Sequence, residues 1–130
     1  MTVLQFAEDV LARIRQREQR FDERAYLFVL AAIEYLQSRL PARRHVSGPE
    51  LAWACRDLAL EQFGLLAPQV LEYWGVRRTE DIGRLVYTLV GVGLLSTQPG
   101  DREEDFAGVY DFREAFRQPY LWEGVSRTED

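Results

Sequence analysis

The chain has 130 residues, of which 47% are hydrophobic and 12% aromatic, and its net charge is −5. This length and composition fit one ordinary globular domain and exclude a largely disordered chain. Cys55 and His45 are the single cysteine and the single histidine. An internal disulfide is therefore impossible, and a Cys/His zinc site or a histidine-based catalytic dyad has almost no groups available. We expect no metal and no cofactor.

The first residues carry no targeting signal. Glu8 and Asp9 lie close to the start, and no basic region precedes an apolar run, so a secretory signal is not predicted. No apolar run approaches the roughly 20 residues of a membrane span. The sequence therefore predicts a cytoplasmic chain without membrane contact.

Two helices are predicted in the first third of the chain, over residues 2 to about 20 and from Asp22 to Pro41. In the first, apolar residues recur at helical spacing on one face only, as in a helix laid on a core. The second is apolar on two sides, which predicts a central position. We expect these helices, residues 1–41, to pack as a pair on the rest of the fold.

A third helix is predicted to begin at Ser47. Ser47, Pro49 and Glu50 have the spacing of a capping box with proline in the first turn. Gly64 can end it. A short helix over 67–74 and another over 79–91 follow, each ending at glycine. Residues 94–97 and 106–112 are predicted as two short strands joined through a Pro-Gly turn.

The order helix, short helix, helix, hairpin resembles the winged-helix fold, most closely over Thr79 to Leu95. We therefore predict a mainly α fold with a winged-helix-like unit of three helices and a β-hairpin over 47–112. Residues 1–116 would form a single domain, followed by a tail over 117–130 that contains Trp122. Such a resemblance implies a scaffold, not a function.

Charge placement argues against a nucleic-acid reader. Residues 1–65 are balanced, whereas residues 66–130 hold seven arginines and twelve acids. The expected hairpin tip over 101–105 is acidic, and carboxylates repel phosphates. Protein binding is therefore favoured, through the following candidate residues: Arg77, Arg78, Arg84, Thr88 and Trp122.

A second candidate surface is a basic face in the first half. It would serve RNA, an acidic protein or the acidic half of a second copy. The simpler interpretation is a salt-bridged surface with Glu18, Asp22 and Glu23 as partners. The residues of this face are Arg13, Arg17, Arg20, Arg39, Arg43 and Arg44.

Four blocks of the chain resemble a bacterial family known as planctomycete- and verrucomicrobium-restricted conserved hypothetical proteins. The blocks are Phe21–Tyr26, Arg44–Gly48, Trp74–Asp81 and Asp105–Phe112. The resemblance spans roughly residues 3–116. It implies no activity and no functional residue, because the family is uncharacterised.

The residues leave three hypotheses. The favoured one is a non-catalytic protein-interaction module or adaptor that binds an unknown protein or itself. A nucleic-acid-binding regulator comes second, and an enzyme comes last because no catalytic spacing stands out. His45 and Cys55 fit a loop histidine and a core thiol better than a base and nucleophile. The acids over 101–105 fit a solvated turn better than a cation site.

Overall fold

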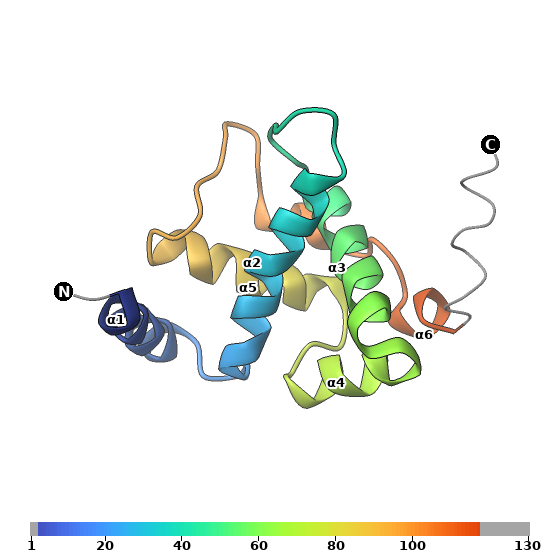
Figure 1. Cartoon of the computed structure of the whole chain (residues 1–130), viewed down its shortest axis with the longest axis horizontal. Coiled ribbons are helices and arrows are strands. Elements are labelled where there is room, and N and C mark those ends of the chain that lie inside the picture. The colour runs from blue at the N-terminus through green and yellow to red at the C-terminus, as the bar shows by residue number, and fades with distance from the viewer. Residues whose placement is uncertain (1–2, 118–130) are drawn as a thin grey trace.

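The computed structural model describes residues 3–117, with side chains from residue 9 onward. Within that part every regular element is helical (Figure 1). The elements are α1 (Val3–Arg17), α2 (Glu23–Ser38), α3 (Gly48–Phe63), the 3-10 helix η1 (Gly64–Leu66), α4 (Ala67–Tyr73), α5 (Thr79–Gly91), the 3-10 helix η2 (Glu103–Phe106) and α6 (Phe112–Ala115).

The helix boundaries follow from local capping. The Ser47 hydroxyl accepts from the Glu50 N–H at 3.2 Å, and the Glu50 carboxylate accepts from the Ser47 N–H at 2.9 Å. The predicted capping box is thus confirmed. At the end of α5, Gly93 has a φ of +87°, and the Leu94 N–H donates to the Leu89 carbonyl at 3.0 Å. A glycine fits there because L side chains disfavour that φ.

Helix α2 lies at the centre and packs against α3 and α5, as its two apolar sides predict (Figure 1). The core extends from Val10 in α1 to Phe116 beyond α6. Around α2 the rings of Phe28, Phe63 and Trp74 form a cluster with centroids 5.7 to 6.4 Å apart. Helix α4 packs against α3 at the lower edge of the view, and α1 meets α5.

The predicted β-hairpin is wrong, and with it the winged-helix-like unit over 47–112. No strand occurs between residues 3 and 117; residues 94–102 form an extended loop, and η2 occupies part of the second expected strand. The part of the chain that the structure describes has helices as its only regular elements.

A packing interaction explains why no second strand forms at residue 106. The Phe106 ring is buried against two helical glycines, Gly83 of α5 and Gly48 of α3. A Cβ on Gly83 would lie 2.9 Å from the Phe106 Cβ, and one on Gly48 would lie 3.2 Å from the Phe106 ring. The missing side chains thus make the space that this ring fills.

The backbone after Phe106 bonds to side chains of α5 instead of a neighbouring strand. The Val109 N–H donates to the Thr79 hydroxyl at 3.1 Å, and the Gly108 N–H donates to the Glu80 carboxylate at 3.2 Å. These bonds satisfy donors that a hairpin would have paired. They also hold residues 108–117 alongside α3 and α5, where these residues form one wall of a groove.

A candidate partner-binding groove

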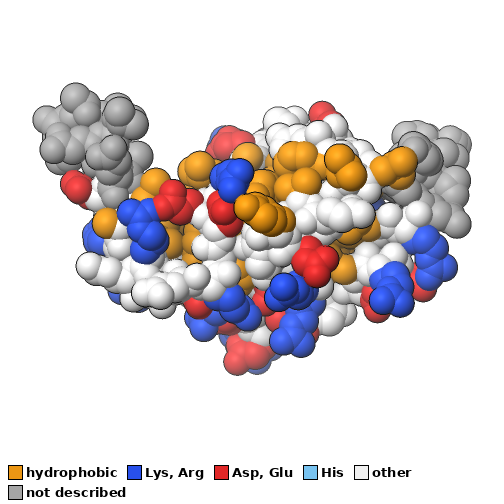
Figure 2. Space-filling view, turned by 90° about the horizontal axis from the view of Figure 1, so that it is seen from below, with side chains coloured by type: hydrophobic (Ala, Val, Ile, Leu, Met, Phe, Trp, Pro, Cys, Tyr) orange, Lys and Arg blue, Asp and Glu red, His pale blue; other side chains and the backbone are white. Residues whose placement is uncertain are grey.

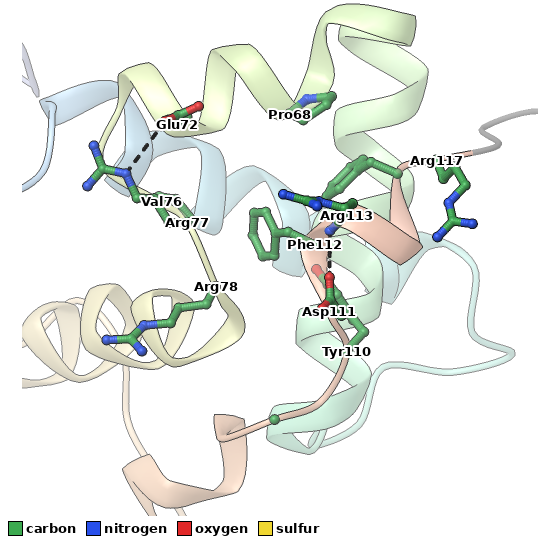
Figure 3. Close-up of a pocket in the computed structure, with 12 residues that line it drawn as sticks. Pro68, Glu72, Val76, Arg77, Arg78, Tyr110, Asp111, Phe112, Arg113 and Arg117 are labelled. Carbon is green, nitrogen blue, oxygen red and sulfur yellow. Dashed lines mark hydrogen bonds and ion pairs between the residues drawn. The ribbon is translucent and has the colours of Figure 1, made fainter.

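A groove of about 1010 Å³ opens between α4 and the segment 108–117 (Figure 3). We call it the arginine groove. Its lining comes from α4, from the connection between α4 and α5, and from the segment that ends at residue 117. The lining residues are Pro68, Glu72, Val76, Arg77, Arg78, Gly108, Tyr110, Asp111, Phe112, Arg113, Phe116 and Arg117.

Aromatic rings form an apolar row in the groove. Tyr110 lies 5.7 Å from Phe112, which lies 5.4 Å from Phe116, between ring centroids. Trp53 of α3 continues the row, 4.6 Å from Tyr110. The Tyr110 hydroxyl donates to the Ala52 carbonyl at 2.8 Å, and burial raises the pKa of Tyr110 well above its usual value. The hydroxyl therefore stays protonated and fixes the row against α3.

Four arginines line the same groove. Arg77 and Arg78 come from the α4–α5 connection, while Arg113 and Arg117 lie on the other side of the groove (Figure 3). Arg77 lies 3.8 Å from Glu72, with both side chains exposed, and Arg117 lies 2.6 Å from Glu114. Within residues 9–117, no carboxylate forms an ion pair with Arg78 or Arg113.

The groove is therefore locally positive on a chain of net charge −5. Its lining has four guanidinium groups and two carboxylates, Glu72 and Asp111. The Asp111 carboxylate accepts from the backbone N–H groups of Arg113 and Glu114, at 2.8 and 3.3 Å, and so caps α6. Guanidinium groups that have no carboxylate partner among the described residues, such as those of Arg78 and Arg113, suit an anionic ligand.

The buried carboxylate of Asp81 positions the arginines on the first side. It accepts from the backbone N–H groups of Arg77 and Arg78, at 2.8 and 3.2 Å, and lies 3.2 Å from the Arg20 guanidinium. Asp81 is only 4% exposed. In the sequence, Asp81 stands in the first turn of a helix, where an acid also interacts favourably with the helix dipole. The signal that could have shown its role is an acid at the third position of a helix, where side chains cap the preceding backbone.

The predicted partner residues do not share one surface. Arg77 and Arg78 line the arginine groove, whereas Arg84 pairs with Glu103 at 3.1 Å. Thr88, a candidate partner-binding residue, is buried, and its hydroxyl donates to the Arg84 carbonyl at 2.8 Å. Its side of α5 is covered because α1, α2 and η2 all pack on this helix. Trp122 lies outside the described residues.

The predicted basic face divides into two groups. The Arg13 guanidinium donates to the Val92 carbonyl at 3.2 Å, and the Arg17 guanidinium lies beside Gly91. Cations at a helix C-terminus complement its dipole, so α1 stabilises the end of α5. Arg20 completes this first group, with Arg13 and Arg17, and pairs with Asp81.

The second group belongs to the end of α2 and the following loop. Each of its arginines pairs with a carboxylate: Arg39 with Glu61 at 3.6 Å, Arg43 with Glu34 at 3.2 Å and Arg44 with Glu50 at 2.9 Å. These pairs match the salt-bridged interpretation, and two of the expected acids, Glu23 and Asp22, pair with the nearby Arg15 and Arg24. Whether either group contacts a partner stays a prediction.

The other candidate residues lie apart. Cys55 is 1% exposed, and burial raises the pKa of its thiol to about 12. His45 lies in an exposed loop, 3.1 Å from Asp101. No cluster of three metal-ligating side chains occurs in the described part, and no helix there is long and apolar enough to cross a membrane.

Exposed apolar side chains cover another flank of α4. Leu66, Val70 and Tyr73 follow each other at helical spacing, and Leu66 and Tyr73 are 61% and 76% exposed. Figure 2 shows hydrophobic side chains gathered on the face seen from below. Pro68 and Glu72 lie on the groove side of the same helix. Helix α4 thus offers apolar surface next to the arginine groove.

Of the twelve lining residues, sequence reasoning singled out only Arg77 and Arg78. The aromatic and basic residues that it missed are Tyr110, Phe112, Arg113, Phe116 and Arg117. Three comparisons with known proteins, against family models, curated proteins and solved structures, each found no match to this chain.

Proposed function

We propose that this protein is a non-catalytic interaction module that binds an acidic segment of a partner protein in the arginine groove. The observation that carries the proposal is that four arginines line the same groove as the Tyr110, Phe112 and Phe116 rings. Most other arginines of the described part are paired with carboxylates of the same chain. Arg78 and Arg113 remain available to a ligand from outside.

The chemistry of the lining specifies the ligand. Guanidinium groups bind carboxylates through paired hydrogen bonds, and aromatic rings pack against apolar side chains. A peptide in which acids alternate with apolar or aromatic residues would satisfy both. An open groove of about 1010 Å³ suits an extended segment better than a small compact molecule.

The surroundings favour a protein over a nucleic acid. Glu72 and Asp111 lie in the groove itself, and Glu80 and Glu114 lie next to it. A phosphate backbone would run past each of these carboxylates, which repel it. A peptide can place a neutral or basic side chain beside them.

The test is direct binding of a fluorescein-labelled peptide of alternating glutamate and tyrosine, measured by fluorescence anisotropy. We expect the full chain to bind it more weakly as salt rises. Arg78→Glu with Arg113→Glu should lower the affinity at least about tenfold, because the new carboxylates would repel the glutamates of the peptide. Arg43→Glu, on the loop after α2, is the matched control and should bind like the wild type.

Three results would overturn the proposal. One is equal binding of the same peptide with glutamine in place of glutamate. Another is unchanged affinity in the doubly substituted variant. The third is tighter binding of a single-stranded oligonucleotide than of the acidic peptide, which would select the regulator hypothesis instead.

Two further proposals rest on the sequence. We propose that the chain belongs to the planctomycete- and verrucomicrobium-restricted bacterial family, on the four blocks named above. We also propose a cytoplasmic location, since the single cysteine is a buried free thiol. The partner of the groove is then a cytoplasmic protein or a second copy of this chain.

A further inference from the structure

We propose that residues 118–130 of the same chain occupy the arginine groove and compete there with the partner. This inference rests on the proposed function, because it assigns a second, internal ligand to the same site. Under this proposal the tail of the chain itself limits how often a partner can bind in the groove.

The position of Arg117 gives the tail access to the groove. Arg117 lines the groove and is the last described residue. Tyr120, Leu121 and Trp122 follow within five residues. An extended chain advances about 3.3–3.6 Å per residue, so Trp122 can reach roughly 17 Å from Arg117. The aromatic row at Phe112 and Phe116 begins in the last helical turn before that point.

Charge and side-chain type match between the tail and the groove. Residues 118–130 contain three carboxylates, Glu123, Glu129 and Asp130, and one arginine, Arg127. The groove offers four arginines against two carboxylates. Tyr120 and Trp122 are the kind of side chain that packs on an aromatic row. The tail thus has the composition that we propose for the partner.

Covalent connection makes a weak contact effective. A short flexible linker gives an effective concentration in the millimolar range. A tail segment with an intrinsic Kd of about 100 μM would then fill the groove roughly nine-tenths of the time, and it would weaken a partner's apparent affinity about tenfold. Removing the aromatic side chains of the tail should raise the partner's apparent affinity by that factor. Because Arg78→Glu with Arg113→Glu would also release the tail, their effect on peptide affinity is measured in a chain that carries Tyr120→Ala and Trp122→Ala as well.

The first experiment locates the Trp122 side chain. The full chain is labelled with 5-fluorotryptophan, which gives one fluorine signal for each of three tryptophans. Trp122→Phe assigns the signal. We expect the Trp122 signal to differ from its position in urea and to move to that position in the Arg78→Glu, Arg113→Glu chain. The Arg43→Glu control should leave it in place. A wild-type Trp122 signal already at the urea position would overturn the inference.

The second experiment measures competition. The glutamate–tyrosine peptide should bind the full chain carrying Tyr120→Ala and Trp122→Ala about tenfold more tightly than the wild type. Equal binding to both would refute the tail proposal and leave the proposed function intact. A Trp122 signal that depends on Arg78 and Arg113, with no peptide binding to either chain, would refute the proposed function and support the tail contact.

Discussion

The Asp81 carboxylate serves three donors from inside the fold. Two of them are backbone N–H groups, of Arg77 and Arg78, and the third is the Arg20 guanidinium. A buried donor that loses its acceptor costs more than an ordinary hydrogen bond contributes. The orientation of the α4–α5 connection therefore depends on this one side chain more than on any exposed ion pair of the molecule.

We expect Asp81→Ala to lower the free energy of unfolding by about 2–3 kcal/mol, because two N–H groups lose their acceptor. Urea unfolding followed by circular dichroism measures the change. Glu34→Ala removes an exposed acid that pairs only with Arg43, and it should leave stability unchanged. Similar effects of the two substitutions would show that the Asp81 bonds do not hold the connection.

At the scale of elements, the start of α3 has a pH dependence of its own. Arg44 and the Ser47 N–H lower the pKa of Glu50 from 4.5 to about 2. A carboxyl with a lowered folded-state pKa stabilises the fold above its unfolded pKa. That stabilisation is lost as pH falls through the folded value. The relevant window therefore lies between about pH 4.5 and pH 2.

Glu50→Gln should remove this part of the acid sensitivity. Since the Glu50 side chain is 40% exposed, solvent screens the interaction, and we expect a difference of only about 1 kcal/mol between the wild type and the variant at pH 6. The difference should shrink as the pH approaches 2. Urea titrations at pH 6, 4 and 2.5 test this, and a constant difference at all three would contradict it.

The contact of η2 with α5 predicts opposite outcomes for two glycines of one helix. Gly83→Ala would force a methyl group to within 2.9 Å of the Phe106 Cβ, which cannot move without its backbone. Overpacking of this kind costs about 1–3 kcal/mol, against a gain of about 1 from helix propensity. We expect a lower melting temperature for Gly83→Ala.

Gly91→Ala is the matched control in the same helix. The atom nearest to its new methyl group is Nη1 of Arg17, at the end of a flexible side chain. The melting temperature should therefore stay the same or rise slightly. If both alanines raised it, the close packing of Phe106 on Gly83 would be refuted.

Helical elements could be predicted from sequence because their signals are local. The capping residues Asp22 and Ser47 and the glycine stops Gly75 and Gly93 lie within a turn of the boundaries that they set. The segment after Gly93 has no such signal. Whether Phe106 joins a strand or fills a space between helices depends on Gly83, which is 23 residues away in the sequence.

At the scale of the whole molecule, the arginine groove could not be predicted from sequence, because its residues are far apart along the chain. The counts of acidic and basic residues predicted a net negative charge for residues 66–130, and that net charge is correct. Folding nevertheless brings Arg77 and Arg78 opposite Arg113 and Arg117, while the acids of residues 101–105 lie outside the lining. A sum of charges along the chain cannot reveal such local separation, because it depends on how α4 and α6 are placed.

The buried Phe106 ring also separates two segments of the chain: the turn before it and the groove wall after it. Beyond it, residues 108–117 are fixed to α3 and α5 by the bonds of Val109 and Tyr110. Before it, the exposed turn at Pro99 and Gly100 contributes nothing to the groove lining. Insertions of different length at that turn would therefore be absorbed upstream of the ring. The molecule can thus carry a variable loop without altering the arrangement of the arginine groove.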